Sequence, residues 1–195
     1  MKKYILSDTL TGVLEKVGIA EINYVQKMLL HYINEYKRQK KENPTKGKSI
    51  AYGIQSIVQE SIDKKIVEEK AKGTNISCRN GCSFCCYLNV DITDDEADLI
   101  LDYTKGNSIK LDKARLDLQS KAKDYEQLPI KDRKCVLLDD KGSCMAYKVR
   151  PNACRKLVVA TDPANCDTDK NLGKKVARLF DVEAEVITSS TLNAT

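Results

Sequence analysis

The sequence predicts a mostly helical fold with one small β-hairpin, an α+β arrangement in which helices pack around a cysteine-rich loop region. Apolar residues recur three and four positions apart over most of residues 1–73 and again over 93–128, which is the spacing of amphipathic helices. Two short apolar runs flank the turn Asp140-Lys141-Gly142, as in a hairpin. All eight cysteines fall between Cys78 and Cys166.

Three helices are expected before the cysteines, each with an apolar stripe on one face, over residues 8–17, 19–42 and 49–72. Gly18, Pro44 and Gly73 supply the stop signals between them. We therefore divide the chain into a helical N-terminal region, residues 1–73, and a cysteine-cluster domain, residues 74–195.

Two further helices are expected after the first cysteines. Residues 93–96, Thr-Asp-Asp-Glu, have the spacing of a capping box, in which Thr93 and Glu96 satisfy each other's backbone amides. A helix should start there and run to about residue 104. Another should follow over 111–128 and stop at Pro129. These two helices would form a wall that holds the cysteine loops.

A short β-hairpin is expected next, with strands at 135–139 and 143–147. Its turn would bring Cys135 and Cys144 close together. Pro151 suits the first residue of a short helix, which would put Cys154 in the first turn, near the positive end of the helix dipole. That position should lower the pKa of the Cys154 thiol.

The tail is ambiguous between the two kinds of secondary structure. Val176, Leu179 and Phe180 suit a helix, whereas the stretch from Val182 to Val186 alternates apolar and polar residues as a strand does.

The composition is that of a globular protein in a reducing compartment. At 195 residues, 42% of them hydrophobic, the chain can bury a core without disulfide staples. The first apolar run stops at Ser7 and Asp8, before a signal-peptide core can form, and no stretch approaches the roughly 18 apolar residues of a membrane span. We therefore expect a cytoplasmic protein without membrane contact, whose thiols are metal ligands or redox groups.

The net charge of +5 lies entirely before residue 74. Much of it is concentrated in six cations: Lys37, Arg38, Lys40, Lys41, Lys46 and Lys48. No aromatic residues interleave with them, so the stretch is interpreted as a solvated helix end and linker, and nucleic-acid binding is not expected. The expected partner is a metal ion, and a protein partner is left open.

The cysteines carry the chemistry. Crowded thiolates repel one another unless a cation neutralises them, and cysteines needed only for packing occur singly. The sequence therefore predicts that the cysteine-rich loop region binds metal through all eight: Cys78, Cys82, Cys85, Cys86, Cys135, Cys144, Cys154 and Cys166.

The spacing of the first four cysteines leaves the number of ions open. On a straight helix Cys78 and Cys85 would be about 10 Å apart along the axis, whereas sulfurs that share a tetrahedral zinc are roughly 4 Å apart. Either this segment is partly a loop, as Asn80-Gly81 suggests, or the four thiols do not share one ion. Two four-sulfur sites, or one such site with spare thiols, both fit.

The metal itself is also left open. Zinc and iron, including an iron–sulfur cluster, both accept all-cysteine coordination. Arg79, Arg150 and Arg155 stand beside cysteines in the sequence, where guanidinium groups can offset thiolate charge.

At these residues the sequence resembles a known family. Cys78-x3-Cys82-x2-Cys85-Cys86 is followed by Cys135-x-Leu-Leu-x3-Gly-x-Cys144-x2-Tyr-x2-Arg-Pro-x2-Cys154-Arg. This pattern, over residues 74–170, resembles the YkgJ-type cysteine-cluster family, whose members are described as zinc- or iron-chelating. The resemblance implies that these cysteines are the ligands and that Tyr147, Arg150, Pro151 and Arg155 shape the site.

The resemblance implies metal binding more firmly than a reaction. Because the family looks related to the cysteine-rich region of flagellin lysine N-methylases, one alternative is an S-adenosylmethionine-dependent protein lysine N-methylase-like enzyme. A second alternative is metal storage or delivery, in which the clustered thiols exchange their ion.

Overall fold

The computed structural model describes residues 4–167, 169–171 and 176–194, and within these residues the chain forms helices and turns but no β-strand. The α-helices are α1 (Asp8–Leu14), α2 (Ile19–Glu42), α3 (Gly47–Ala71), α4 (Asp94–Gly106), α5 (Lys113–Lys121), α6 (Ile130–Arg133), α7 (Asn152–Arg155) and α8 (Val182–Ala194). Short 3₁₀ helices are η1 (Phe84–Tyr87), η2 (Tyr125–Gln127), η3 (Tyr147–Val149) and η4 (Pro163–Cys166).

The helices expected from the sequence are present, but two are shorter than expected, and the first of these, expected over 8–17, ends at Leu14. The Ser7 hydroxyl caps α1, and Thr93 and Glu96 form the predicted capping box at the start of α4. The helix expected over 111–128 ends instead at Lys121. None of the residues of α5 is buried, and a helix without a packed apolar face gains little tertiary stabilisation to prolong it.

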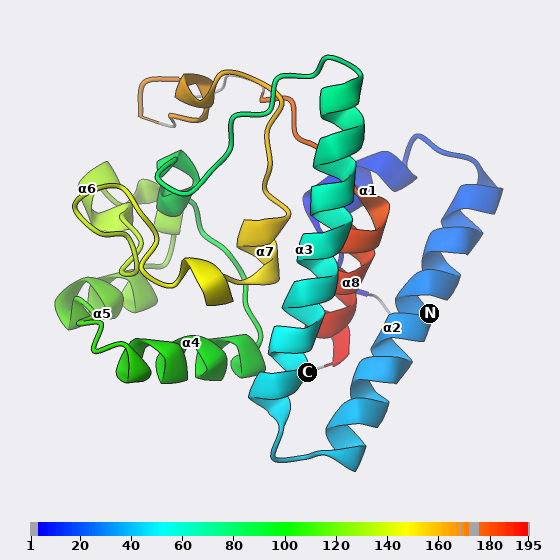
Figure 1. The fold of residues 1–195 in the computed structure, drawn as a ribbon, viewed down its shortest axis with the longest axis horizontal. Coiled ribbons are helices and arrows are strands. Elements are labelled where there is room, and N and C mark those ends of the chain that lie inside the picture. The colour runs from blue at the N-terminus through cyan, green and yellow to red at the C-terminus, as the bar shows by residue number, and fades with distance from the viewer. Residues whose placement is uncertain (1–3, 168, 172–175, 195) are drawn as a thin grey trace.

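Helix α8 forms the centre of the helical bundle, packed against α1, α2 and α3 (Figure 1). Ala184 and Ile187 join Val58 and Ile62 of α3 in one apolar cluster. Val186 joins a second cluster with residues of α1 and α2. The tail that the sequence left ambiguous is thus a helix where its residues alternate like a strand, over 182–186, and is not helical over 176–181. Small residues allow α8 to be enclosed on several sides.

Buried hydroxyl groups in α8 are satisfied within the helix. Thr188 Oγ1 donates to the carbonyl of Ala184 at 2.7 Å, and Ser190 Oγ donates to the carbonyl of Val186 at 2.7 Å. Both hydroxyls thus reach a carbonyl one turn back. A polar sequence can therefore occupy the core without leaving these groups unpaired.

The other face of α3 holds α4 and α7 (Figure 1). Asp95 at the start of α4 is buried, accepts a hydrogen bond from Tyr36 at 2.5 Å and pairs with Lys40 at 2.7 Å. A Cβ at Gly47 would lie 2.0 Å from Asp95 Oδ1, so this approach requires glycine. The basic end of α2 thus ties α2 to α4.

The predicted hairpin is wrong. Between 135 and 147 only Leu138 and Cys144 form an antiparallel pair, and the pair is isolated. The Leu138 amide donates back to the carbonyl of Cys135, and the Cys135 amide donates to the carbonyl of Cys86 at 2.8 Å. Two hydrogen bonds cross the turn, from the Met145 amide to the Leu137 carbonyl at 2.8 Å and from the Asp139 amide to the Ser143 carbonyl at 3.0 Å. The ladder stops there, because the Cys135 amide is bonded to Cys86 and the Tyr147 amide donates to the carbonyl of Cys144. The turn itself is present, with Gly142 at φ +78°.

No helix in the described part of the chain has the length and apolar character needed to span a bilayer.

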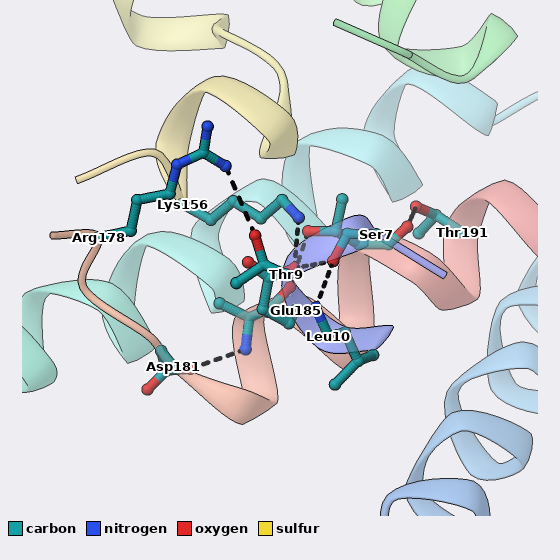
Figure 2. Close-up of polar contacts among 10 residues, drawn as sticks. Ser7, Thr9, Leu10, Lys156, Arg178, Asp181, Glu185 and Thr191 are labelled. Carbon is teal, nitrogen blue, oxygen red and sulfur yellow. Dashed lines mark hydrogen bonds and ion pairs between the residues drawn. The ribbon is translucent and has the colours of Figure 1, made fainter. Parts of the chain in front are cut away.

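A buried ion pair joins the chain after α7 to the bundle (Figure 2). Lys156 pairs with Glu185 of α8, and their side chains are 14% and 7% exposed. The same carboxylate accepts a hydrogen bond from Ser7, the cap of α1, at 2.6 Å. One carboxylate therefore connects α1, α8 and the segment that carries Cys154.

Replacing Glu185 by Gln should destabilise the fold by about 3 kcal/mol, because it leaves the Lys156 ammonium buried without its counter-charge. Thermal unfolding should show a fall of roughly 6 to 12 °C in Tm. The double variant Glu185→Gln, Lys156→Met should recover part of that loss.

The exposed pair Glu60–Lys64, with side chains 69% and 71% exposed, is the matched control. Glu60→Gln should change stability by no more than about 0.5 kcal/mol. Equal effects of Glu185→Gln and Glu60→Gln would contradict the role given to the buried pair.

Candidate metal centre

The segment from Cys78 to Cys86 is a turn followed by a 3₁₀ helix, so the expectation of a partial loop is confirmed. The Cys82 amide donates to the carbonyl of Arg79 at 3.0 Å, and Gly81 has φ +91°. Cys85 and Cys86 then lie in η1. The side chains of these two neighbours are hydrogen-bonded to each other.

Four cysteines form a group that we call the inner thiols: Cys86, Cys135, Cys144 and Cys154. The 2.8 Å bond between the Cys135 amide and the Cys86 carbonyl places two of their segments side by side. The bridge between Leu138 and Cys144 closes the loop that begins at Cys135. Cys144 packs on the cluster formed by Ile100, Ala146 and Val149.

Three more form the outer thiols: Cys78, Cys82 and Cys166. The Cys78 sulfur accepts a hydrogen bond from the Val159 amide at 3.3 Å and packs on the bundle core. Helix η4, which ends in Cys166, packs against η1. Burial and the thiolate charges of Cys78 and Cys82 raise the pKa of Cys166, so the three sulfurs lie within electrostatic range of one another.

Cys85 lies between the two groups and is the most acidic of the thiols with a resolved shift. A hydrogen bond from the Cys86 thiol lowers its pKa to about 7, and the positive charge of Arg150 acts in the same direction. The same hydrogen bond, together with burial, raises the pKa of Cys86. The negative charge of the Cys85 thiolate acts on both groups, because it raises the pKa of Cys82 and the pKa of Cys154.

Cys154 lies in α7 as predicted, but the direction expected for its pKa is wrong. Burial raises the pKa of Cys154 to about 12, and the neighbouring thiolates Cys85, Cys135 and Cys144 add to that shift. Helix α7 has only four residues, so its dipole is small beside the cost of placing another negative charge in this group. A bound cation would reverse that balance.

The three arginines have different roles. Arg150 faces the inner thiols, where its charge lowers the pKa of Cys144 and Cys154 against the effect of burial, and its guanidinium carbon lies 3.8 Å from the centre of the Tyr147 ring. Arg79 is exposed. Burial raises the pKa of Cys82, and the charge of Arg79 only partly opposes that rise.

Arg155 positions the backbone of the inner thiols. It is 7% exposed and donates to the carbonyls of Lys148 and Arg150 at 2.7 and 2.9 Å. It also donates to Gln55 and Gln59 on α3 at 3.3 and 3.0 Å. The chain around Cys154 is thereby fixed to α3.

These glutamines were not anticipated from the sequence. Gln55 is 1% exposed, and Gln59 accepts hydrogen bonds from both Arg150 and Arg155. Their spacing of four residues places them on one face of α3, and this spacing was the only available signal. Asn152 is a further buried residue, and its side-chain amide has no hydrogen-bond partner among the residues that the structure describes.

The eight cysteines carry free thiols and are partly buried. Within the described residues, no three His, Cys, Asp or Glu side chains are arranged closely enough to hold a metal ion as they stand. Staggered rotamers move a sulfur about Cβ without moving the backbone. Convergence on an ion would therefore be a rearrangement of side chains within groups that the backbone already brings together.

A family model covers this part of the chain. The CxxCxxCC family, described as "Putative zinc- or iron-chelating domain", matches residues 77–175, just over half of the 195 residues. The chain belongs to the CxxCxxCC family. No curated protein and no solved structure gives a significant match.

This member of the CxxCxxCC family has one more residue between its first two cysteines than the family name indicates, since three residues separate Cys78 from Cys82. Gly81 occupies the left-handed region in that turn, a conformation that only glycine adopts freely. The added residue is thus accommodated in a tight turn.

The turn at Gly142 packs against this loop. A Cβ on Gly142 would lie 3.5 Å from Ser83 Oγ and 3.7 Å from the carbonyl oxygen of Gly81. Space for a methyl group is therefore available, and the φ of +78° is what disfavours other residues.

Gly142→Ala should destabilise the protein by about 1 kcal/mol or more, because alanine is strained at this φ. The expected fall in Tm is roughly 2 to 4 °C. Gly53→Ala is the control, since Gly53 lies within α3 and a Cβ there meets nothing within 4 Å. That variant should be stabilised by about 0.5 to 1 kcal/mol, and destabilisation of both would argue against the strain explanation.

Proposed function

We propose that the protein chelates zinc or iron through all eight cysteines, with the inner thiols, the outer thiols and Cys85 as its ligands. The observation that carries this proposal is the gathering of free thiols from separate segments into two adjacent groups beside a positive charge, Arg150. The family to which the chain belongs supports the same chemistry.

The physical argument is one of charge. Burial and neighbouring thiolates raise the pKa of the inner thiols Cys135, Cys144 and Cys154, so these groups resist ionisation together. A divalent or higher-charged cation bound by sulfur compensates that repulsion and favours the deprotonated ligands. Thiolate ligands suit zinc and iron, and iron–sulfur clusters as well.

Second, we propose that the protein works in the cytoplasm. Free thiols at all eight positions fit a compartment in which cysteines stay reduced. The methylase-like alternative remains a prediction from the sequence resemblance, and no contact among the described residues favours it.

The deciding experiment is elemental analysis with an absorption spectrum on protein purified without oxygen. Iron, acid-labile sulfide and a broad band near ~400 nm would identify a cluster. Colourless protein with bound zinc would identify thiolate sites of the zinc type. Protein that binds neither metal, including after incubation of the reduced protein with Zn²⁺ or Fe²⁺, would overturn the proposal.

Cys135→Ser should lower the bound metal and reduce Tm by roughly 10 °C or more, because metal-binding energy at such a site is also folding energy. Metal content per chain and a thermal melt, each with and without a chelator, measure this. Lys141→Ala, an exposed change in the same loop, should leave both unchanged. Metal content equal to that of the parent protein in Cys135→Ser would remove Cys135 from the ligand set.

A further inference from the structure

We infer that Gln59 is a positioning residue: it holds the Arg150 guanidinium beside the inner thiols, so that the thiols near this charge react preferentially with anionic molecules rather than neutral ones. This inference goes beyond metal chelation, because it concerns the free thiols and the molecules that approach them. Gln59 lies in α3, outside residues 77–175 that the family model matches.

The side-chain amide of Gln59 is held in one orientation. Its oxygen accepts hydrogen bonds from Arg150 Nη2 at 2.9 Å and from Arg155 Nη1 at 3.0 Å. Its nitrogen donates to Asp63 Oδ1 at 2.9 Å. Because a guanidinium only donates and an ionised carboxylate only accepts, a flipped amide would lose all three bonds. One amide therefore fixes two guanidinium groups relative to α3.

The direction of the Arg150 guanidinium depends on Gln59 and Tyr147. Its Nη1 donates to the carbonyl of Tyr147 at 3.2 Å, and its central carbon lies 3.8 Å from the centre of the Tyr147 ring, a cation–π contact. Tyr147 is only three residues away in the sequence. Among the described residues, the hydrogen bond to Gln59 is the one that ties this guanidinium to the helical bundle.

Turns on either side of Arg150 carry two of the inner thiols. The Tyr147 amide donates to the carbonyl of Cys144 at 3.2 Å, and the Cys154 amide closes a turn that begins one residue after Arg150. The charge of Arg150 acts to lower the pKa of Cys85, Cys144 and Cys154, against the effect of burial. The guanidinium that Gln59 holds is therefore within electrostatic range of three thiols.

A positive charge at this position should select among molecules that reach the thiols. Interaction between unit charges a few ångströms apart changes a rate severalfold even in water, and partly buried charges are screened less by salt than exposed ones. An anionic reagent should therefore gain an advantage over a neutral one of similar shape. Without Gln59 the guanidinium can turn toward solvent, and the advantage should diminish.

The test compares alkylation by iodoacetate, an anion, with alkylation by neutral iodoacetamide on the reduced full chain in the presence of a chelator. Peptide mass spectrometry gives the rate at each cysteine at a single pH. In both reactions the thiolate sulfur bonds to the CH₂ carbon and iodide leaves, so a change in thiol ionisation cancels in the ratio of the two rates.

In Gln59→Met the iodoacetate-to-iodoacetamide ratio should fall about threefold at Cys85, Cys144 and Cys154. The ratio should stay unchanged at Cys166, on which Arg178 acts instead of Arg150. Gln59→Asn keeps an amide but shortens its reach by one CH₂ group, and it should lower the ratio at the same three thiols. A thermal melt establishes that each variant is folded at the assay temperature.

Arg150→Gln should lower the ratio at least as much as Gln59→Met does. Adding Gln59→Met to Arg150→Gln should then change nothing further, because Gln59 acts through Arg150. Gln55→Met is the matched control, since Gln55 lies one turn earlier on α3 and accepts a hydrogen bond from Arg155 at 3.3 Å. It should keep the ratio of the parent protein even though its Tm falls.

An unchanged ratio in the folded Gln59 variants would overturn the inference. An equal fall in Gln55→Met would show that loosening of the helix contacts, rather than the direction of Arg150, changes the ratio. A further fall in the double variant would show that Gln59 does not act through Arg150. Either of these results would also contradict the positioning role.

Discussion

Helix α3 makes two different kinds of contact, apolar packing on one face and hydrogen bonds on another. The rest of the structure depends on both. Val58 and Ile62 pack with Ala184 and Ile187 of α8 in the apolar core. On another face, α3 presents Gln55 and Gln59 to the guanidinium of Arg155. The same helix therefore supports the bundle by apolar burial and the cysteine loops by hydrogen bonds, so the stability of one is coupled to the position of the other.

The cysteine region is organised around a conflict between burial and charge. Thiols gathered in a partly buried region cannot all ionise without compensation, and Arg150 supplies only one positive charge among them. The loops that hold the thiols use amide hydrogen bonds and left-handed glycines, Gly81 and Gly142, in place of regular strands. Such a framework brings the sulfurs together without enclosing them. A bound cation would compensate the charge of the thiolates there.

The two groups of thiols are anchored unequally in the fold. The inner thiols are connected to α3, α4 and α8, whereas Cys166 belongs to a segment held mainly by its own turns.

Local signals in the sequence determined much of the outline. The capping box at Thr93, the turn at Gly142 and the motif cysteines each depend on neighbouring residues, so their structure could be predicted from spacing. Three features depended on contacts between distant segments. The hairpin failed because the Cys135 amide is taken by Cys86, and the pKa of Cys154 rises because burial and other thiolates outweigh a short helix dipole.

The third feature is α8, whose polar sequence does not resemble a core helix. Its hydroxyls donate hydrogen bonds to its own carbonyls. Glu185 contacts Lys156 and Ser7 only in the folded chain, because both are far away in the sequence. The sequence by itself therefore determined the cysteine motif of the family and where most helices begin and end, since both follow from local chemistry. Only the tertiary structure decided which thiols lie together and which helix forms the core, because burial and charge at those positions are set by residues far away in the chain.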